Sequence, residues 1–515
     1  MIKSGPPTLR QSERGSARSR AARNSLKSTA EFSRPADRPW PRVSTCGGTL
    51  AKPYGHRPRQ SPGDDLPVIS LLMTPRHSRS APRNGAGATS ARQPTKRFGN
   101  AGLSVRIVIK RQTMVPIPVL FTHFGDEWIR GSETALLDLL SALDKERVRP
   151  VVWCNAAEMA AAACSAGYPT HRSDFRYFFD YSSPRPNLSC LLELVRTCRA
   201  LCRTYGIRVL HANSAAPAQW LVPAGFGARL PVLVHLHISY LRRSRYVLLL
   251  HRATLAVGVS RQVINDLLAD GMAPARTRVI YNGINVARLN RSAIDLKGLL
   301  KIPAGAFVIA TTGSLITRKG HDVLIRAFAS LSAEPMPHLL ILGDGPERNS
   351  LEALATSLGI AERVHFLGYI KDFVEVYQAA DLFALASRGD AFGLVLAEAG
   401  YFSLPSVSTR VGGIPEVIAH EKTGLLVPPD DVAAFSSALE RLMRDKTLRA
   451  RFGSAAAARV EAMFTVERMA REFEEAYATL AAIPAARLGW RGATRGLLPY
   501  LRLIGARSGQ PQTLL

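Results

Sequence analysis

Short apolar runs alternate with longer segments of helical periodicity from about residue 114 onward. The first series of apolar runs predicts strands at 115–122, 149–154, 209–212, 232–237, 255–259 and 278–281. The second series, which follows a break at 282–303, predicts strands at 308–312, 339–342, 364–367, 382–386, 406–408 and 425–427. Apolar strands separated by helical segments are typical of parallel sheets that are covered on both faces. The pattern therefore predicts an α/β fold with two doubly wound, Rossmann-like domains.

This pattern divides the chain into five segments. We expect a basic extension at 1–113, a first Rossmann-like domain at 114–289, a second at 290–465, a closing helix at 466–483 and a basic, apolar tail at 484–515. Thr465 is a plausible N-cap for the closing helix, which we expect to pack back on the first domain. The tail suits either an anionic membrane surface or a poorly ordered cover of the protein surface.

Most of the positive charge lies in the extension. Residues 1–113 contain 22 Lys and Arg against 5 Asp and Glu, so +17 of the formal charge of +27 falls there and +10 on the rest. The extension is rich in Arg, Ser, Pro and Gly, and we expect it to be disordered. An organelle transit peptide and a nucleic-acid arm are possible interpretations. We favour a third, a translated leader that the fold does not need, because Met114 directly precedes the first predicted strand.

Two acidic residues in the second domain flank an apolar segment. Asp390 and Glu398 are eight residues apart, and a helix over 392–402 would place Asp390 just before its start and Glu398 two turns in. Free N–H groups of Phe392, Gly393 and Leu394 at that helix start suit a phosphate or a sugar hydroxyl. This arrangement predicts a nucleotide-sugar site.

A glycine-rich loop with two adjacent cations follows the strand predicted at 308–312. The sequence GSLITRKG runs from Gly313 to Gly320 and contains Ser314, Arg318 and Lys319. A loop between a strand and a helix is positioned to hold phosphates, which the two cations would attract.

Together these motifs resemble the group-4 family of retaining glycosyltransferases, which have the GT-B architecture of two Rossmann-like domains facing across a cleft. The resemblance implies that Glu398 binds ribose hydroxyls, that Asp390 lies beside the donor sugar and that Lys319 neutralises the leaving diphosphate. The family usually has Glu in place of Asp390 and Arg in place of Ser314, and Arg318 would supply the second charge here.

The resemblance also implies roles for residues of the first domain. His237, at the end of a predicted strand, matches the histidine that the family presents to the donor sugar. Gly131, Ser132 and Glu133 resemble the loop where N–H groups approach the donor phosphate and the acceptor enters. His211 and Glu133 are acceptor-side candidates. Tyr369 and Ile370, in the second domain, match the positions at which members of the family bind the nucleotide base.

The resemblance implies a hexosyltransferase (EC 2.4) that moves a sugar from a UDP- or GDP-sugar to a glycan or lipid-linked acceptor with retention, in cell-surface or exopolysaccharide synthesis. We expect no cofactor and no metal requirement, because cations and helix dipoles would hold the diphosphate. A non-catalytic nucleotide-sugar-binding protein remains the alternative. We expect a cytoplasmic protein with possible peripheral contact to the inner face of the membrane through the basic tail, and no nucleic-acid partner.

Overall fold

The computed structural model describes residues 115–125, 129, 131–176, 187–290, 294–332, 335–370 and 374–488. The first sheet has seven parallel strands in the order β3-β2-β1-β4-β5-β6-β7. Its strands are β1 (Ile117–His123), β2 (Val148–Cys154), β3 (Thr170–Arg172), β4 (Val209–Asn213), β5 (Val232–Leu236), β6 (Leu255–Gly258) and β7 (Thr277–Val279). The reversal of strand order beside β1 is the topology of a doubly wound sheet.

The second sheet has six parallel strands in the order β10-β9-β8-β11-β12-β13. Its strands are β8 (Val308–Thr312), β9 (His338–Leu342), β10 (Val364–Gly368), β11 (Leu382–Leu385), β12 (Ser406–Thr409) and β13 (Gly424–Val427). Here the order reverses beside β8, so the loops after β8 and β11 lie at the switch point where such sheets bind ligands.

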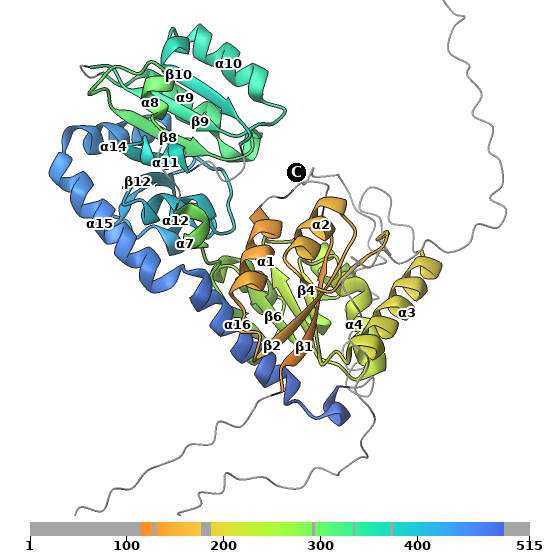
Figure 1. The fold of residues 1–515 in the computed structure, drawn as a ribbon. Coiled ribbons are helices and arrows are strands. Elements are labelled where there is room, and N and C mark those ends of the chain that lie inside the picture. The colour runs from red at the N-terminus through yellow and green to blue at the C-terminus, as the bar shows by residue number, and fades with distance from the viewer. Residues whose placement is uncertain are drawn as a thin grey trace, which may run out of the picture. The chain divides into compact units, whose positions relative to one another are not determined.

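Helices connect the strands of both sheets (Figure 1). Those before β8 are α1 (Gly131–Ala142), α2 (Ala157–Ser165), α3 (Leu188–Tyr205), α4 (Ala218–Ala228), α5 (Arg242–Val247), α6 (Arg261–Ala269), α7 (Val286–Leu289) and α8 (Leu296–Leu299). Those after β8 are α9 (His321–Ala329), α10 (Arg348–Ser357), α11 (Glu375–Gln378), α12 (Leu394–Tyr401), α13 (Ile414–Val417), α14 (Val432–Arg444), α15 (Lys446–Met463) and α16 (Val466–Ala481).

Alternate strand residues supply the cores on the two faces of each sheet. In β1, Val119 and Phe121 pack with residues of α1 and α16, whereas Leu120 packs with residues of α3 and α4. In β8, Ile309 packs with α9 and α14, whereas Val308 and Ala310 belong to the core that includes α12. Burial of both faces explains why these strands are continuous apolar runs in the sequence.

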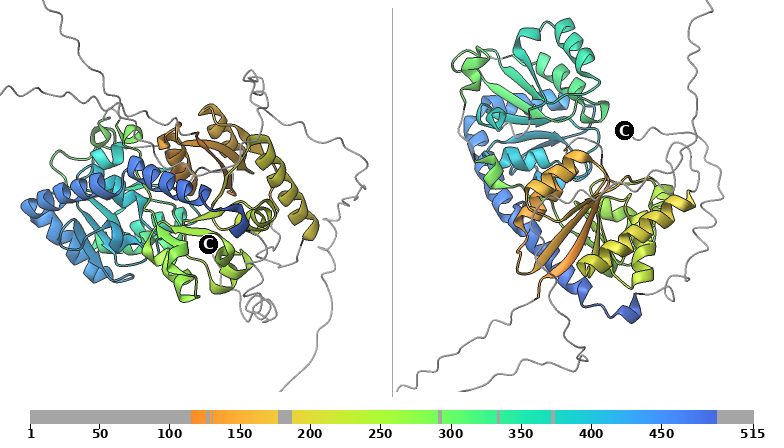
Figure 2. Two further views of the ribbon diagram at one scale, coloured as in Figure 1. Left: turned by 90° about the horizontal axis from the view of Figure 1, so that it is seen from below. Right: turned by 45° about the vertical axis from the view of Figure 1, so that its right-hand side comes forward.

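Helix α16 packs against the first sheet although it follows the second sheet in the chain (Figures 1 and 2). The Thr465 side chain accepts a hydrogen bond from the Arg468 N–H, so Thr465 caps this helix as predicted. Phe473 and Tyr477 are fully buried, and Tyr477 meets Phe121 of β1 edge to face. Glu474 also accepts hydrogen bonds from the Asp144 N–H and the Arg147 guanidinium.

The predicted α/β fold with two doubly wound sheets is confirmed. The prediction missed β3, a three-residue edge strand of sequence THR, which is too short and too polar to produce an apolar run. The extension at 1–113 and most of the tail, 489–515, lie outside the described residues. Within the part of the chain that the structure describes, no helix combines the length and the apolar character needed to cross a membrane.

Candidate functional site

The loop after β8 brings Lys319 to the carboxyl edge of the second sheet. Residues Thr317–Lys319 form one 3₁₀ turn, and α9 begins at His321, so the loop runs from Gly313 to Gly320 as predicted. Gly320 between them has φ 64°, and a Cβ there would lie 2.1 Å from the Ala386 carbonyl oxygen. Only glycine fits, because the backbone that carries Lys319 passes directly over the end of β11.

Lys319 pairs with Asp390, and both side chains are mostly buried. Lys319 Nζ lies 2.6 Å from Asp390 Oδ2. Burial raises the pKa of the Asp390 carboxyl, but Lys319 outweighs this effect, so the pKa lies below its ordinary value. Arg318, also close enough to lower this pKa, donates to the Gly389 carbonyl oxygen at 2.6 Å. The structure thus brings together three residues that the sequence predicted as one charged site.

One detail of the prediction at Asp390 is wrong. Helix α12 begins at Leu394 rather than at Phe392, after Gly393 with φ 85°. The N–H groups of Phe392 and Gly393 are not free for a ligand, because they donate to Asp390 Oδ1 at 3.4 and 3.0 Å. Asp390 therefore anchors the turn before the helix as well as pairing with Lys319, which an acceptor-only carboxylate can do.

Glu398 lies within α12 and is held by two partners that the sequence did not reveal. Its Oε1 accepts from Arg288 at 3.0 Å, and its Oε2 accepts from the Tyr377 hydroxyl at 2.7 Å. Arg288 belongs to α7, and its Nε is also 3.8 Å from Asp138 of α1. Burial and the nearby Glu398 charge raise the pKa of Tyr377 well above its usual value, so its hydroxyl stays protonated and donates.

Four further residues predicted for the donor site, Gly313, Ser314, Tyr369 and Ile370, are half-buried or exposed. Gly313, with φ 153°, directly follows β8, and Ser314 beside it is exposed. Tyr369 and Ile370 follow β10 with 59% and 43% of their surfaces exposed, and the Tyr369 hydroxyl donates to the Ile129 carbonyl oxygen at 3.4 Å. An aromatic ring and an aliphatic side chain left this exposed suit a flat ligand such as a base.

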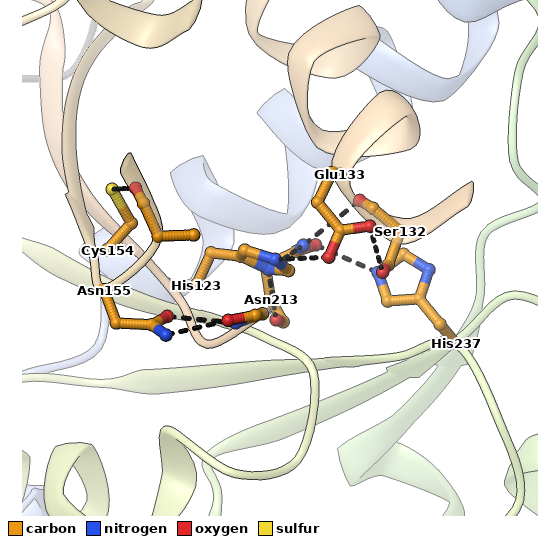
Figure 3. Close-up of polar contacts among 9 residues, drawn as sticks. His123, Ser132, Glu133, Cys154, Asn155, Asn213 and His237 are labelled. Atoms are coloured by element: carbon orange, nitrogen blue, oxygen red, sulfur yellow. Dashed lines mark hydrogen bonds and ion pairs between the residues drawn. The ribbon is translucent and has the colours of Figure 1, made fainter. Parts of the chain in front are cut away.

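In the first sheet, polar side chains at the carboxyl ends of β1, β4 and β5 form one network with the start of α1 (Figure 3). His123 Nε2 lies 2.8 Å from Glu133 Oε1, and both side chains are almost fully buried. Ser132 donates to the other Glu133 oxygen at 3.0 Å. Asn213 lies between His123 and His237, with Oδ1 3.0 Å from His237 Nε2.

Gly125 covers this network from the loop after β1. Asn155 accepts from the Gly125 N–H at 3.0 Å and donates to its carbonyl oxygen at 2.7 Å, which fixes the loop (Figure 3). A Cβ at Gly125 would lie 2.6 Å from His123 Nε2 and 2.7 Å from Glu133 Oε1. Glycine is therefore needed here, because a side chain would clash with the paired imidazole and carboxylate.

The candidate histidines occupy different environments. His237 is half-buried just beyond β5, and burial together with His123 lowers its pKa to about 4, although Glu133 opposes the shift. His211 is fully buried and its Nδ1 contacts the Tyr477 hydroxyl at 2.7 Å, with a pKa lowered by burial to about 3. This burial under α16 argues against the acceptor-side role predicted for His211.

Four residues of these networks were missed by the sequence reasoning. His123 and Asn213 each stand one residue beyond a predicted strand, so a search for polar residues at the carboxyl ends of parallel strands would have found them. Arg288 and Tyr377 lie in short helices outside any motif, and only the three-dimensional contacts reveal them.

Two family models match successive parts of the chain. The model described as "Glycosyltransferase Family 4" matches residues 129–288, and "Glycosyl transferases group 1" matches residues 295–459. The chain belongs to the group-4 glycosyltransferases. It is therefore a transferase of class EC 2.4, and the matched ranges contain Lys319, Asp390 and Glu398 on one side and Glu133, Asn213 and His237 on the other.

Relatives and solved structures agree with this assignment. The chain is 28% identical over 298 residues to N-acetyl-alpha-D-glucosaminyl L-malate synthase of Bacillus anthracis, covering 56% of this chain and 78% of that protein. It is 37% identical over 174 residues to the lipopolysaccharide core biosynthesis glycosyltransferase LpsE of Rhizobium meliloti, covering 34% of this chain and 49% of that protein. Anabaena Alr3699/HepE in complex with UDP has the same fold, with a TM-score of 0.61 and 22% identity over 70% of this chain and all of that one. The predicted GT-B architecture is thus confirmed.

Proposed function

We propose that this glycosyltransferase moves a sugar from a nucleoside diphosphate sugar to a hydroxyl of a glycan or lipid-linked acceptor in cell-surface or exopolysaccharide synthesis, with retention of anomeric configuration. The pairing of Lys319 with Asp390 beside Arg318 is the observation that carries the proposal. Cations and a carboxylate at the switch point of a parallel sheet suit a ligand that combines a diphosphate with hydroxyls. UDP is the nucleotide in the Anabaena complex, so UDP-sugars are the first donors to test and GDP-sugars the second.

The second-sheet residues act on the donor in this proposal. Lys319 and Arg318 offset the charge that develops on the diphosphate as the glycosidic bond breaks. Asp390 accepts a hydrogen bond from a hydroxyl of the donor sugar once Lys319 turns to the phosphate. Glu398 accepts hydrogen bonds from the ribose hydroxyls. A carboxylate can do this because it retains lone pairs beyond those that already accept from Arg288 and Tyr377. Tyr369 and Ile370 contact the base.

The first-sheet residues complete the reaction. His237 contacts the donor sugar, and Gly131 and Ser132 at the start of α1 approach the diphosphate. The acceptor hydroxyl, near Glu133, attacks on the face that the leaving group vacates, and a phosphate oxygen takes its proton. A double displacement would instead need a carboxylate on the opposite face of the sugar. Because protein cations offset the diphosphate charge, we propose that no metal is required.

The test is a nucleotide-release screen on the full chain with UDP-, GDP- and ADP-sugars in EDTA. We expect release from one donor class, abolished in Lys319→Ala and in Glu398→Ala. Lys422→Ala is the matched control, because Lys422 is an exposed lysine on a turn before β13, and it should keep wild-type release. Binding of a donor without release or transfer, with a range of acceptor glycans present, would favour the non-catalytic binding protein. Release only after Mg²⁺ is restored would overturn the proposed metal independence.

We also propose peripheral contact with the cytoplasmic face of a membrane through the basic tail. A cavity of about 560 Å³ where the tail begins supports this proposal, since its lining includes Arg252, Arg276, Arg278 and Arg487 but no acidic residue. Leu480, Ile483 and Leu488 supply an apolar wall beside these arginines. Cationic and apolar groups together suit anionic lipid headgroups. Flotation with anionic but not zwitterionic vesicles is expected, and equal behaviour with both would refute the contact.

A further inference from the structure

Asn213 is the residue through which the two imidazoles of the first-sheet network are connected. It ends β4, is fully buried, and has a histidine on each side of its amide (Figure 3). Its Nδ2 lies 2.9 Å from His123 Nδ1 and 3.3 Å from the Ser132 carbonyl oxygen. Its Oδ1 lies 3.0 Å from His237 Nε2. Each end of the amide therefore meets one ring nitrogen.

The surrounding acceptors determine which atoms carry hydrogens. An ionised carboxylate and a carbonyl oxygen can only accept, so Glu133 requires a proton on His123 Nε2. The Ser132 carbonyl requires the NH₂ end of the Asn213 amide, because the opposite orientation would place two oxygens 3.3 Å apart. That NH₂ group then donates to His123 Nδ1, which is unprotonated.

The same amide orientation determines the state of His237. The Asn213 amide oxygen faces His237 Nε2 and can only accept, so Nε2 carries the proton. A neutral imidazole has one donor nitrogen and one acceptor nitrogen, which leaves Nδ1 as the acceptor. Among the residues that the structure describes, none hydrogen-bonds to Nδ1 of His237. This nitrogen is consequently available to a ligand hydroxyl.

The alternative arrangement has a chemical cost. The Asn213 main-chain oxygen lies 3.1 Å from His123 Nδ1 and would accept a hydrogen bond from it if His123 were protonated on both nitrogens. Nδ1–H would then face the Asn213 NH₂ group, and the amide would have to turn over. That turn would set the amide oxygen against the Ser132 carbonyl oxygen and would give His237 the opposite tautomer.

The backbone directly after Asn213 is strained. Ser214, the next residue, has φ 108°, which is rare for any residue with a side chain. Its N–H donates to the His235 carbonyl oxygen at 2.9 Å, so β5 holds the strained residue in place. Strain of this kind persists only where neighbouring structure maintains it and is concentrated at functional sites.

From this geometry we propose that Asn213 is a positioning residue that holds His237 as its Nε2–H tautomer, so that Nδ1 accepts a hydrogen bond from a hydroxyl of the donor sugar. The inference rests on the proposed donor contact of His237 and adds the form in which that side chain acts. It predicts that the enzyme selects sugars that carry a hydroxyl, able to donate a hydrogen bond, at the position facing His237. A fluorine or hydrogen in place of that hydroxyl could not donate, so such analogues should be poor donors.

Among the described residues, four titratable groups influence or adjoin His237 besides the Asn213 amide: His123, Glu133, His235 and His211 of β4. His123 from β1 and Glu133 from α1 influence its charge in opposite directions, and the His235 ring from β5 lies 4.2 Å from it between centroids. Burial is the largest influence and keeps the ring neutral at pH 7, with a pKa of about 4. The tautomer therefore decides which nitrogen of the His237 ring accepts a hydrogen bond and which donates one.

The experiment measures the tautomers directly in the full chain labelled with ¹⁵N-histidine. Long-range ¹H–¹⁵N spectra at pH 7.5 are assigned with His123→Gln and His237→Gln, and both rings should show Nε2–H. In Asn213→Leu, which removes the amide but retains its approximate volume, the His237 signals should change to a mixture of tautomers. Circular dichroism checks that each variant is folded. Nδ1–H on His237 in the wild type, or an unchanged tautomer in folded Asn213→Leu, would overturn the proposal.

A second variant provides a pH readout that a merely structural role would not change. Asn213→Asp places a carboxylate between the imidazoles, which favours their charged forms. The acid limb of kcat should then move to higher pH by at least about one unit. Asn349→Asp is the matched control, because it makes the same change at an exposed position of α10 in the second sheet's domain. Equal shifts in both variants would overturn the role of Asn213.

The two readouts separate this inference from the proposed function. The tautomers are measured without any sugar transfer. Expected tautomers in a protein that consumes no donor would contradict the transferase proposal and support the role of Asn213. Donor turnover by a protein whose His237 has the other tautomer would support the transferase proposal and contradict the role of Asn213.

Discussion

The two sheets present different chemistry at the same structural position. At the carboxyl edge of the second sheet, full charges meet in pairs: Lys319 with Asp390, and Arg288 with Glu398. At the carboxyl edge of the first sheet, the described imidazole and amide groups meet one another and the Glu133 carboxylate through directional hydrogen bonds. The comparison suggests a division of labour in which one half offsets the charge of a diphosphate and the other orients sugar hydroxyls.

The largest effect should come from breaking the charged half of the site, which we define as Lys319, Asp390, Arg288 and Glu398 at the carboxyl edge of the second sheet. Lys319→Met is expected to lower kcat/KM by about 10²–10³-fold, the usual loss when one preorganised group that stabilises developing negative charge is removed. If Lys319 served only to neutralise Asp390, the double variant with Asp390→Asn would recover activity. We expect no recovery, because both residues are proposed to contact the donor. Steady-state kinetics on the two single variants and the double variant decide between these outcomes.

Acid should weaken the first sheet before the second. Burial lowers the folded-state pKa of His211 to about 3 and that of His235 well below its usual value. Below about pH 6.5 the unfolded chain binds protons that these folded imidazoles do not, so unfolding free energy falls as pH falls. His211 and His235 together should lower the unfolding free energy by about 3 kcal/mol for each pH unit of acidification between pH 6 and pH 4.

In the second sheet, His321 is the fully buried histidine with a comparable shift, to about 4, and Asp390 loses its stabilising charge only below its ordinary pKa. Hydrogen exchange at pH 7, 6 and 5 can follow the two sheets separately. Strands β4 and β5 should lose protection at higher pH than β8 and β11. Simultaneous loss in all four strands would contradict this difference between the halves.

A methyl group at Gly320 should disrupt the charged half without touching a charged side chain. Gly320→Ala must adopt a positive φ and place its Cβ 2.1 Å from a backbone oxygen, for a loss of about 2–3 kcal/mol in unfolding free energy. Gly359→Ala is the matched control, since φ is similar, at 68°, but its Cβ would meet nothing within 4 Å. It should lose only about 1 kcal/mol. Equal losses in urea unfolding would mean that the close approach to Ala386 is unimportant.

The two halves also differ in how far their sequence revealed them. In the second sheet, Lys319, Asp390 and Glu398 were predicted because charged residues beside glycines form motifs along the chain. The network of the first sheet draws single polar residues from β1, β4 and β5, and only His237 and the residues at the start of α1 were predicted. His123 and Asn213 are marked in the sequence only by their position at the ends of predicted strands, and their partners are 10 and 90 residues away. Folding alone brings such residues together, as it does Arg288 and Glu398, 110 residues apart.

The smallest effect, and the sharpest test of the division of labour, concerns Arg288. Its guanidinium orients Glu398 without being proposed to touch the reacting atoms, so Arg288→Met should raise KM for the donor about tenfold and leave kcat nearly unchanged. Arg326→Met, an exposed arginine on α9, is the matched control and should change neither constant. A fall in kcat at unchanged KM would place Arg288 in the chemical step instead. The charged half would then do more than bind the nucleotide, because a residue that orients ribose binding alone cannot slow the bound complex.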